Sequence, residues 1–156
     1  MELSFSKEER LCSRKQIEQL YAEGHRMMAF PYSVTWLISS ECGVQSSELS
    51  ECGSDTSDHH SSFFILHSSL FIPCQVLIVA PKRRFHHAVD RNRVKRLTRE
   101  CWRHTKPQLY DFLAEHGISL TLSLVYIHNE IMPYEQLLRK MEKLVLQLQK
   151  EIENAQ

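Results

Sequence analysis

Residues 88–104 read Ala88-Val-Asp-Arg-Asn-Arg-Val-Lys-Arg-Leu-Thr-Arg-Glu-Cys-Trp-Arg-His104. Val94, Leu97 and Cys101 recur at helical spacing, which predicts an amphipathic helix with one apolar stripe. A second stripe on the same helix is polar and consists of Asn92, Arg96, Arg99 and Arg103. One side of this helix can therefore pack on a sheet while another presents amide and guanidinium groups.

Positive charge is concentrated in and around this helix. Residues 79–106 hold ten basic and two acidic side chains, a net charge of +8, while the rest of the chain carries −8 and the whole chain is neutral. Charge runs are more often only solvated faces, but here arginines begin in the first turns of the helix, where the helix dipole disfavours cations. Helix stability therefore does not explain them, and the cluster predicts a nucleic-acid surface. Arginine also suits two-pronged contacts with phosphate.

Residues 88–100 resemble the signature of the protein component of bacterial ribonuclease P. That signature is an Ala-Val pair, a variable residue, Arg-Asn-Arg, an aliphatic residue, Lys-Arg, two variable positions and Arg-Glu, and each fixed element is present in order. The start of the chain is similar to the family's first helix and the turn after it, through Glu8-Glu9-Arg10-Leu11, Arg14-Lys15, Tyr21 and Gly24. The resemblance covers residues 6–38 and 74–154.

The resemblance implies a protein that assists catalysis by RNA. In ribonuclease P the RNA subunit binds Mg²⁺ and hydrolyses the bond between the 5′ leader and tRNA, so we expect no catalytic residue and no cofactor in the protein itself. Its expected partners are the catalytic RNA and precursor tRNA. The residues expected to bind the catalytic RNA are Arg91, Asn92, Arg93, Lys95, Arg96 and Arg99, extended by Lys82, Arg83, Arg84 and Arg103.

The 5′ leader is expected along an exposed cleft of the sheet, where single-stranded bases stack on aromatic side chains. Tyr32 and Trp36 on one strand are the candidates, with Tyr21 from the first helix and Arg14 and Lys15 beside it. The alternative is that Trp36 and Tyr21 are core residues, and Tyr32 is expected to be the more exposed of the strand pair.

Two other functions remain open from the residues alone. One is an RNA-binding module of ribosomal or chaperone type without a role in cleavage. The other is a protein-only nuclease that uses His86 or His87, although the sequence supplies no obvious partner groups for them. Cys42 and Cys52, with two histidines downstream, do not have the spacing of a zinc site, so no metal is expected.

Length and composition predict one domain over residues 1–156 with a low-complexity acidic insert at about 39–62. Within the insert Ser40-Glu-Cys-Gly43 recurs as Ser50-Glu-Cys-Gly53, and lysine and arginine are absent. The start of the chain is polar and no apolar run reaches the length of a membrane span, so we expect a cytoplasmic protein with no membrane partner.

Hydrophobic patterns predict an α+β fold, a mixed four-stranded sheet with helices packed on one face. The resemblance adds a left-handed βαβ crossover. Strands are predicted at 30–38, 62–66, 74–80 and 120–127, and helices from 13 to Gly24, at 88–104, at 107–116 and from Pro133 onward. Cys74 and Cys101 are expected in the core.

Overall fold

The computed structural model describes residues 4–39 and 72–155, which contain three helices and four strands. In chain order these are α1 (Arg14–Glu23), β1 (His25–Ala29), β2 (Tyr32–Ser39), β3 (Cys74–Val79), α2 (Ala88–His116), β4 (Ser119–Tyr126) and α3 (Tyr134–Ala155). The predicted α+β class is confirmed.

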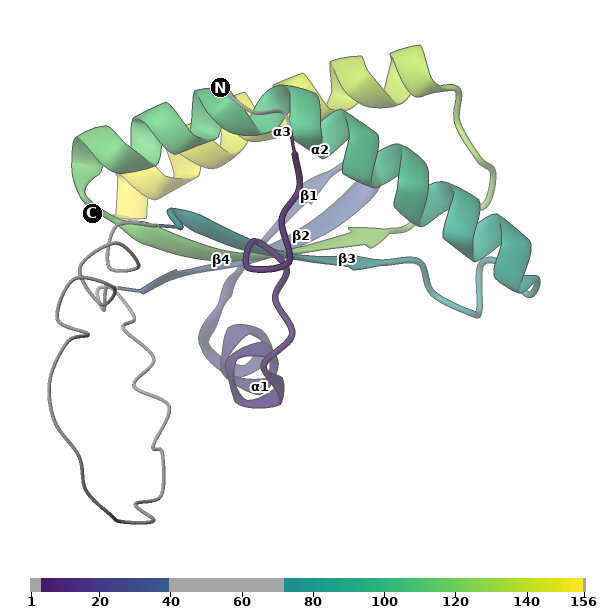
Figure 1. Ribbon diagram of the computed structural model, residues 1–156, viewed down its shortest axis with the longest axis horizontal. Helices are drawn as coiled ribbons and strands as arrows, with labels where there is room; N and C mark the ends of the chain where they lie inside the picture. The colour runs from purple at the N-terminus through teal and green to yellow at the C-terminus, as the bar shows by residue number, and fades with distance from the viewer. Residues whose placement is uncertain (1–3, 40–71, 156) are drawn as a thin grey trace, which may run out of the picture.

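The four strands form one mixed sheet in the order β1-β2-β4-β3. β2 pairs antiparallel with β1 and with β4, whereas β3 pairs parallel with β4. In Figure 1 the chain follows β3, rises into α2, returns above the sheet and enters β4 behind β3. This crossover is left-handed, as the family resemblance implies. Most parallel βαβ crossovers are right-handed.

The two faces of the sheet are covered differently (Figure 1). α2 and α3 lie side by side over one face, and α1 lies against the other, so the expectation of helices on one face is wrong for α1. The Tyr21 hydroxyl of α1 is hydrogen-bonded to Ser123 Oγ of β4 at 2.8 Å. Gly24 allows this close approach, because a Cβ at that position would lie 2.8 Å from Thr35 Cγ2.

The main core lies between the sheet and the helices α2 and α3. Alternation along β4 directs Leu120, Leu122 and Leu124 to this side, and all three are buried. Cys74 and Cys101 are buried as predicted, and burial raises the pKa of the Cys101 thiol to about 12. The stripe predicted for the last helix also forms core, through Leu137, Met141, Leu144, Val145, Leu148 and Ile152.

An extended segment before α1 closes the β3 edge of the sheet. Val76 N–H donates to the carbonyl of Glu9 at 2.8 Å, and Leu11 N–H donates to the carbonyl of Val76 at 3.1 Å. The Glu9 carboxylate is buried and accepts from Lys106 Nζ of α2 at 2.5 Å and from the Tyr110 hydroxyl at 2.8 Å. The segment is thus attached to both the sheet and α2.

Two element predictions are corrected by the structure. The chain between Gly24 and Phe30 forms β1, which pairs with β2 and was not predicted. α2 is one helix through Pro107, where a break was predicted. Thr105 and Lys106 before the proline and Leu109 after it are all buried, so packing on both sides holds the helix together. The predicted strand 62–66 and residues 40–62 of the insert lie outside the described residues.

Candidate nucleic-acid interface

The buried side and the outer side of α2 carry different types of residue. Between Val94 and Thr105 the side toward the sheet is uncharged and contains Val94, Thr98, Cys101, Trp102 and Thr105. The outer side holds a set that we call the arginine face, which consists of Asn92, Arg93, Arg96, Arg99 and Arg103. The structure therefore brings these predicted RNA-binding residues onto one surface.

The arginine face carries cations that the fold itself does not use. Asn92, Arg93 and Arg96 are exposed, and Arg99 is half-buried. Within the described residues, Arg93, Arg96 and Arg99 make no hydrogen bond or ion pair with other side chains or with the backbone. Arg103 differs, because its Nη1 lies 2.9 Å from Glu100 Oε2. Lys95, also predicted to bind RNA, is half-buried beside the arginine face.

Arg91 holds the loop that precedes α2. Its Nη1 donates to the carbonyl oxygens of Phe85 at 2.9 Å and His86 at 2.7 Å. This guanidinium therefore fixes backbone as well as adding charge, which the sequence pattern did not indicate. The same loop exposes Lys82, Arg83 and Arg84 shortly before α2 begins, so they add positive charge near its N-terminus.

Lys106 belongs to the core, although it stands within the basic segment of the sequence. The residue is 6% exposed, and its Nζ is hydrogen-bonded to Glu9 and to the carbonyl oxygen of Ser4. Burial alone would raise the pKa of the Glu9 carboxyl. Hydrogen bonds from Lys106, Tyr110 and the Ser6 backbone, together with the Lys106 charge, outweigh burial and hold that pKa below its ordinary value.

The expectation that Tyr32 is exposed is wrong, and for Trp36 the structure shows the alternative, a core residue. Tyr32 and Trp36 are 0% and 2% exposed, and they face α2 and α3 rather than α1. The Tyr32 hydroxyl is hydrogen-bonded to Thr98 Oγ1 of α2 at 3.0 Å, and Trp36 stacks on His25 at a centroid distance of 4.7 Å. Period-two alternation correctly predicted that both side chains lie on one face of β2, but α2 and α3 cover that face.

The remaining leader-binding candidates lie on α1. Tyr21 is 37% exposed, and Arg14 and Lys15 are exposed. On the side of α1 the sheet carries polar residues that were not predicted as part of the site, among them Thr35, Thr121 and Ser123, and all three are buried. Their sequence signal is the alternation of β4, in which leucines alternate with serine and threonine.

Across residues 4–39 and 72–155, no three histidine, cysteine, aspartate or glutamate side chains gather in a way that could hold a metal ion. His86 and His87 are exposed on the loop before α2. The cysteines and histidines weighed for zinc between residues 42 and 60 fall outside the described part of the chain. None of the described helices has the length and apolar character needed to cross a membrane.

Comparisons with known proteins agree with this geometry. The family model described as Ribonuclease P matches residues 5–149. Ribonuclease P protein components from two strains of Porphyromonas gingivalis are each 29% identical to this chain over 143 residues, which covers 92% of this chain and 85% of theirs. The Ribonuclease P protein component of Chlorobium phaeobacteroides is 40% identical over 72 residues, 42% of this chain and 49% of its own.

Proposed function

This chain belongs to the ribonuclease P protein family, and from that premise we propose that its arginine face binds the catalytic RNA of ribonuclease P. The RNA performs the cleavage at its own Mg²⁺ site, and the protein supplies counter-charge and position. The product is tRNA with a mature 5′ end. Arg91 acts in this proposal mainly by ordering the loop that exposes Lys82, Arg83 and Arg84.

The observation that carries the proposal is the set of unpaired guanidinium groups on α2. Arg93, Arg96 and Arg99 project from one rigid helix and have no partner among the described residues. Three neighbouring cations repel one another, so an anionic polymer that neutralises them gains affinity without displacing any internal contact. Folded RNA fits, because its deep major groove leaves phosphates and unpaired bases as the accessible groups.

The 5′ leader of precursor tRNA is proposed to lie on the surface between α1 and the sheet. Tyr21 offers a ring that is 37% exposed, while its hydroxyl is hydrogen-bonded to the buried Ser123. Arg14 and Lys15 add charge at the start of α1, although Arg14 also pairs with Glu18 at 3.1 Å. Tyr32 and Trp36 have no part in this proposal, because both are enclosed by the core.

The test is reconstitution with a bacterial ribonuclease P RNA and precursor tRNA at low magnesium. We expect the protein to stimulate cleavage, and we expect Arg93→Ala to weaken binding of the catalytic RNA by about tenfold, the value of one charge-assisted phosphate contact. The matched control is Arg139→Ala, which removes an exposed arginine from α3. The melting temperature of both variants should stay close to that of the unmodified protein.

Three results would contradict the proposal. RNA binding without stimulation of cleavage would favour the RNA-binding module. Cleavage by the protein alone, abolished by His86→Ala or His87→Ala, would favour a protein-only nuclease. Unfolding of Arg93→Ala would make Arg93 a structural residue.

A further inference from the structure

We propose that a pocket at the beginning of α2 receives the base of one unpaired nucleotide of the RNA partner, with guanine as the preferred base. The proposal rests on the proposed function, since it assumes an RNA along the arginine face. It adds a base-reading site to a surface that otherwise contacts phosphate.

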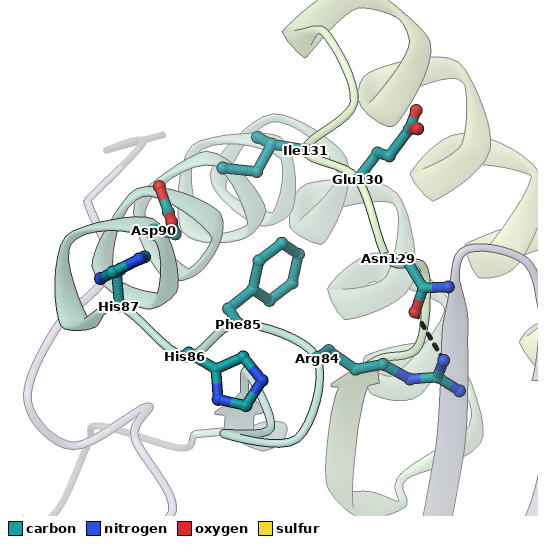
Figure 2. A pocket seen from close by; sticks show the side chains of 8 residues that line it. All are labelled: Arg84, Phe85, His86, His87, Asp90, Asn129, Glu130 and Ile131. Carbon is teal, nitrogen blue, oxygen red and sulfur yellow. Dashed lines mark hydrogen bonds between the residues drawn. The ribbon is translucent and has the colours of Figure 1, made fainter.

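The pocket lies between the loop before α2, the first turn of α2 and the loop that joins β4 to α3 (Figure 2). Its cavity volume is about 440 Å³, within the usual range for a small-molecule site. Figure 2 shows Phe85 in the middle of the site, with Asp90 of α2 on one side and Asn129 of the β4–α3 loop on the other. Phe85 is 6% exposed, so its ring forms part of a fixed apolar wall.

Hydrogen bonds hold the loop before α2 in place. Arg91 binds the carbonyl oxygens of Phe85 and His86, and the backbone N–H groups of Arg84 and Phe85 donate to the carbonyl of Pro81 at 3.1 and 3.2 Å. This wall is therefore formed before any ligand arrives, which lowers the entropic cost of binding.

The opposite wall is ordered as well. Tyr126 donates its hydroxyl to the carbonyl of Glu130 at 2.7 Å and accepts from Met132 N–H at 3.3 Å. Arg84 spans the two walls, because its Nη1 donates to Asn129 Oδ1 at 2.5 Å, the dashed line in Figure 2. Both loops thus have their backbones fixed by partners outside the cavity.

Asp90 and Glu130 line the pocket with carboxylates that the fold does not use, and in Figure 2 the Glu130 side chain extends away from Phe85. Among the described residues, no hydrogen bond or ion pair engages the side chain of Asp90 or Glu130. These acids give the pocket negatively charged acceptors, which the residues of the arginine face do not include. A carboxylate accepts from the donor edge of a base, and guanine presents two adjacent donors, N1–H and the N2 amino group.

The position of the pocket connects it to the proposed RNA surface. Arg93 follows Asp90 by three residues, so the first exposed arginine of α2 stands one helical turn from the Asp90 side of the pocket. The backbone of a bound nucleotide can therefore stay on cations while its base turns toward Phe85 and Asp90. An unpaired nucleotide suits this arrangement, because its base is not already engaged in a helix.

Titration of the whole protein with mononucleotides tests the site without the ribozyme. We expect GMP to shift the NMR signals of His86, Asn129 and Ile131 at lower concentration than AMP, CMP or UMP. Asp90→Asn should weaken GMP binding by about tenfold, in the range of one two-donor base contact, and Glu130→Gln should weaken it less. The matched control is Glu142→Gln, an exposed acid of α3. Equal binding of all four nucleotides, or shifts that ignore both substitutions, would overturn the proposal.

A second experiment uses the assembled ribonucleoprotein. A photo-crosslinking amino acid in place of His86 should attach to one unpaired guanosine, and replacing that guanosine by inosine should weaken assembly by about tenfold. Crosslinks confined to paired nucleotides would refute the site. Since Asp90 also complements the dipole of α2, the melting temperature of Asp90→Asn is measured alongside.

The two proposals can fail separately. Arg93→Ala tests the arginine face, whereas Asp90→Asn and Glu130→Gln test only the pocket.

Discussion

The N-terminal and C-terminal halves of α2 use cations in opposite ways. Arg93 and Arg96 stand exposed and have no partner among the described residues, whereas Lys106, three turns further along, is 6% exposed and bound to Glu9. The difference is one of helical angle, because Lys106 follows the buried Trp102 by four residues and shares its side of the helix. Charge that is continuous in the sequence is thus divided in the structure between a surface and a core.

The largest expected effect is the salt dependence of RNA binding, which only the exposed cations should produce. If roughly 6–10 phosphates are neutralised, affinity should fall about 10³–10⁵-fold between about 50 and 200 mM salt on the duplex-DNA scale. Arg96→Ala should lower the slope of log affinity against log salt by about 1. Binding measured at four or five salt concentrations checks both, and a slope near zero would contradict a phosphate-binding face.

The next largest expected effect is a loss of stability when the buried cation of α2 is removed. Lys106→Met leaves the Glu9 carboxylate without its cation in the core, so we expect a loss of about 3–5 kcal/mol in the free energy of unfolding. Urea unfolding measures this loss, with Lys143→Met on the exposed side of α3 as the control. Where the variant is folded, its affinity for RNA should be unchanged. Weaker RNA binding by folded Lys106→Met would show that the buried pair also shapes the interface.

The smallest effect is a dependence of stability on acid pH. The pKa of Glu9 in the folded chain lies below its ordinary value of 4.5. The ionised carboxylate therefore stabilises the fold above that ordinary value, and the stabilisation is lost as pH falls through the lower folded value. The difference in unfolding free energy between the unmodified protein and Glu9→Gln should shrink from pH 6 toward pH 3. A constant difference would contradict the assigned pKa direction.

Local patterns in the sequence predicted most of the elements, and the failures have local causes. β3, β4 and α3 followed from hydrophobic alternation or helical spacing. β1 was missed because His25-Arg-Met-Met-Ala29 shows no clear alternation and depends on pairing with β2. The predicted break at Pro107 did not occur, because buried neighbours on both sides outweigh the lost backbone hydrogen bond.

Site residues could be predicted where helical spacing alone determines which side chains share a surface. They could not be predicted where contacts between distant elements determine which side chains are buried. The arginine face follows from spacing within α2. Period-two alternation groups Tyr32 with Trp36 but does not say which sheet face a helix covers, so their burial could not be read from β2 alone. The pairing of Glu9 with Lys106 joins residues 97 positions apart, although the position of Lys106 four residues after Trp102 was a signal that it turns inward.

The ends of β2 and β3 determine where the segment between residues 40 and 71 is attached. Ser39 pairs with Ser119, and Cys74 pairs with Leu120, so the chain leaves and rejoins the sheet beside the C-terminal end of α2. The loop that carries Arg83 stands at the other end of this helix, roughly 40 Å away along its axis. A fluorophore or affinity handle built into that segment is therefore joined to the fold at the end of α2 opposite Lys82, Arg83 and Arg84, which offers a route to immobilise the protein through a point far from these cations.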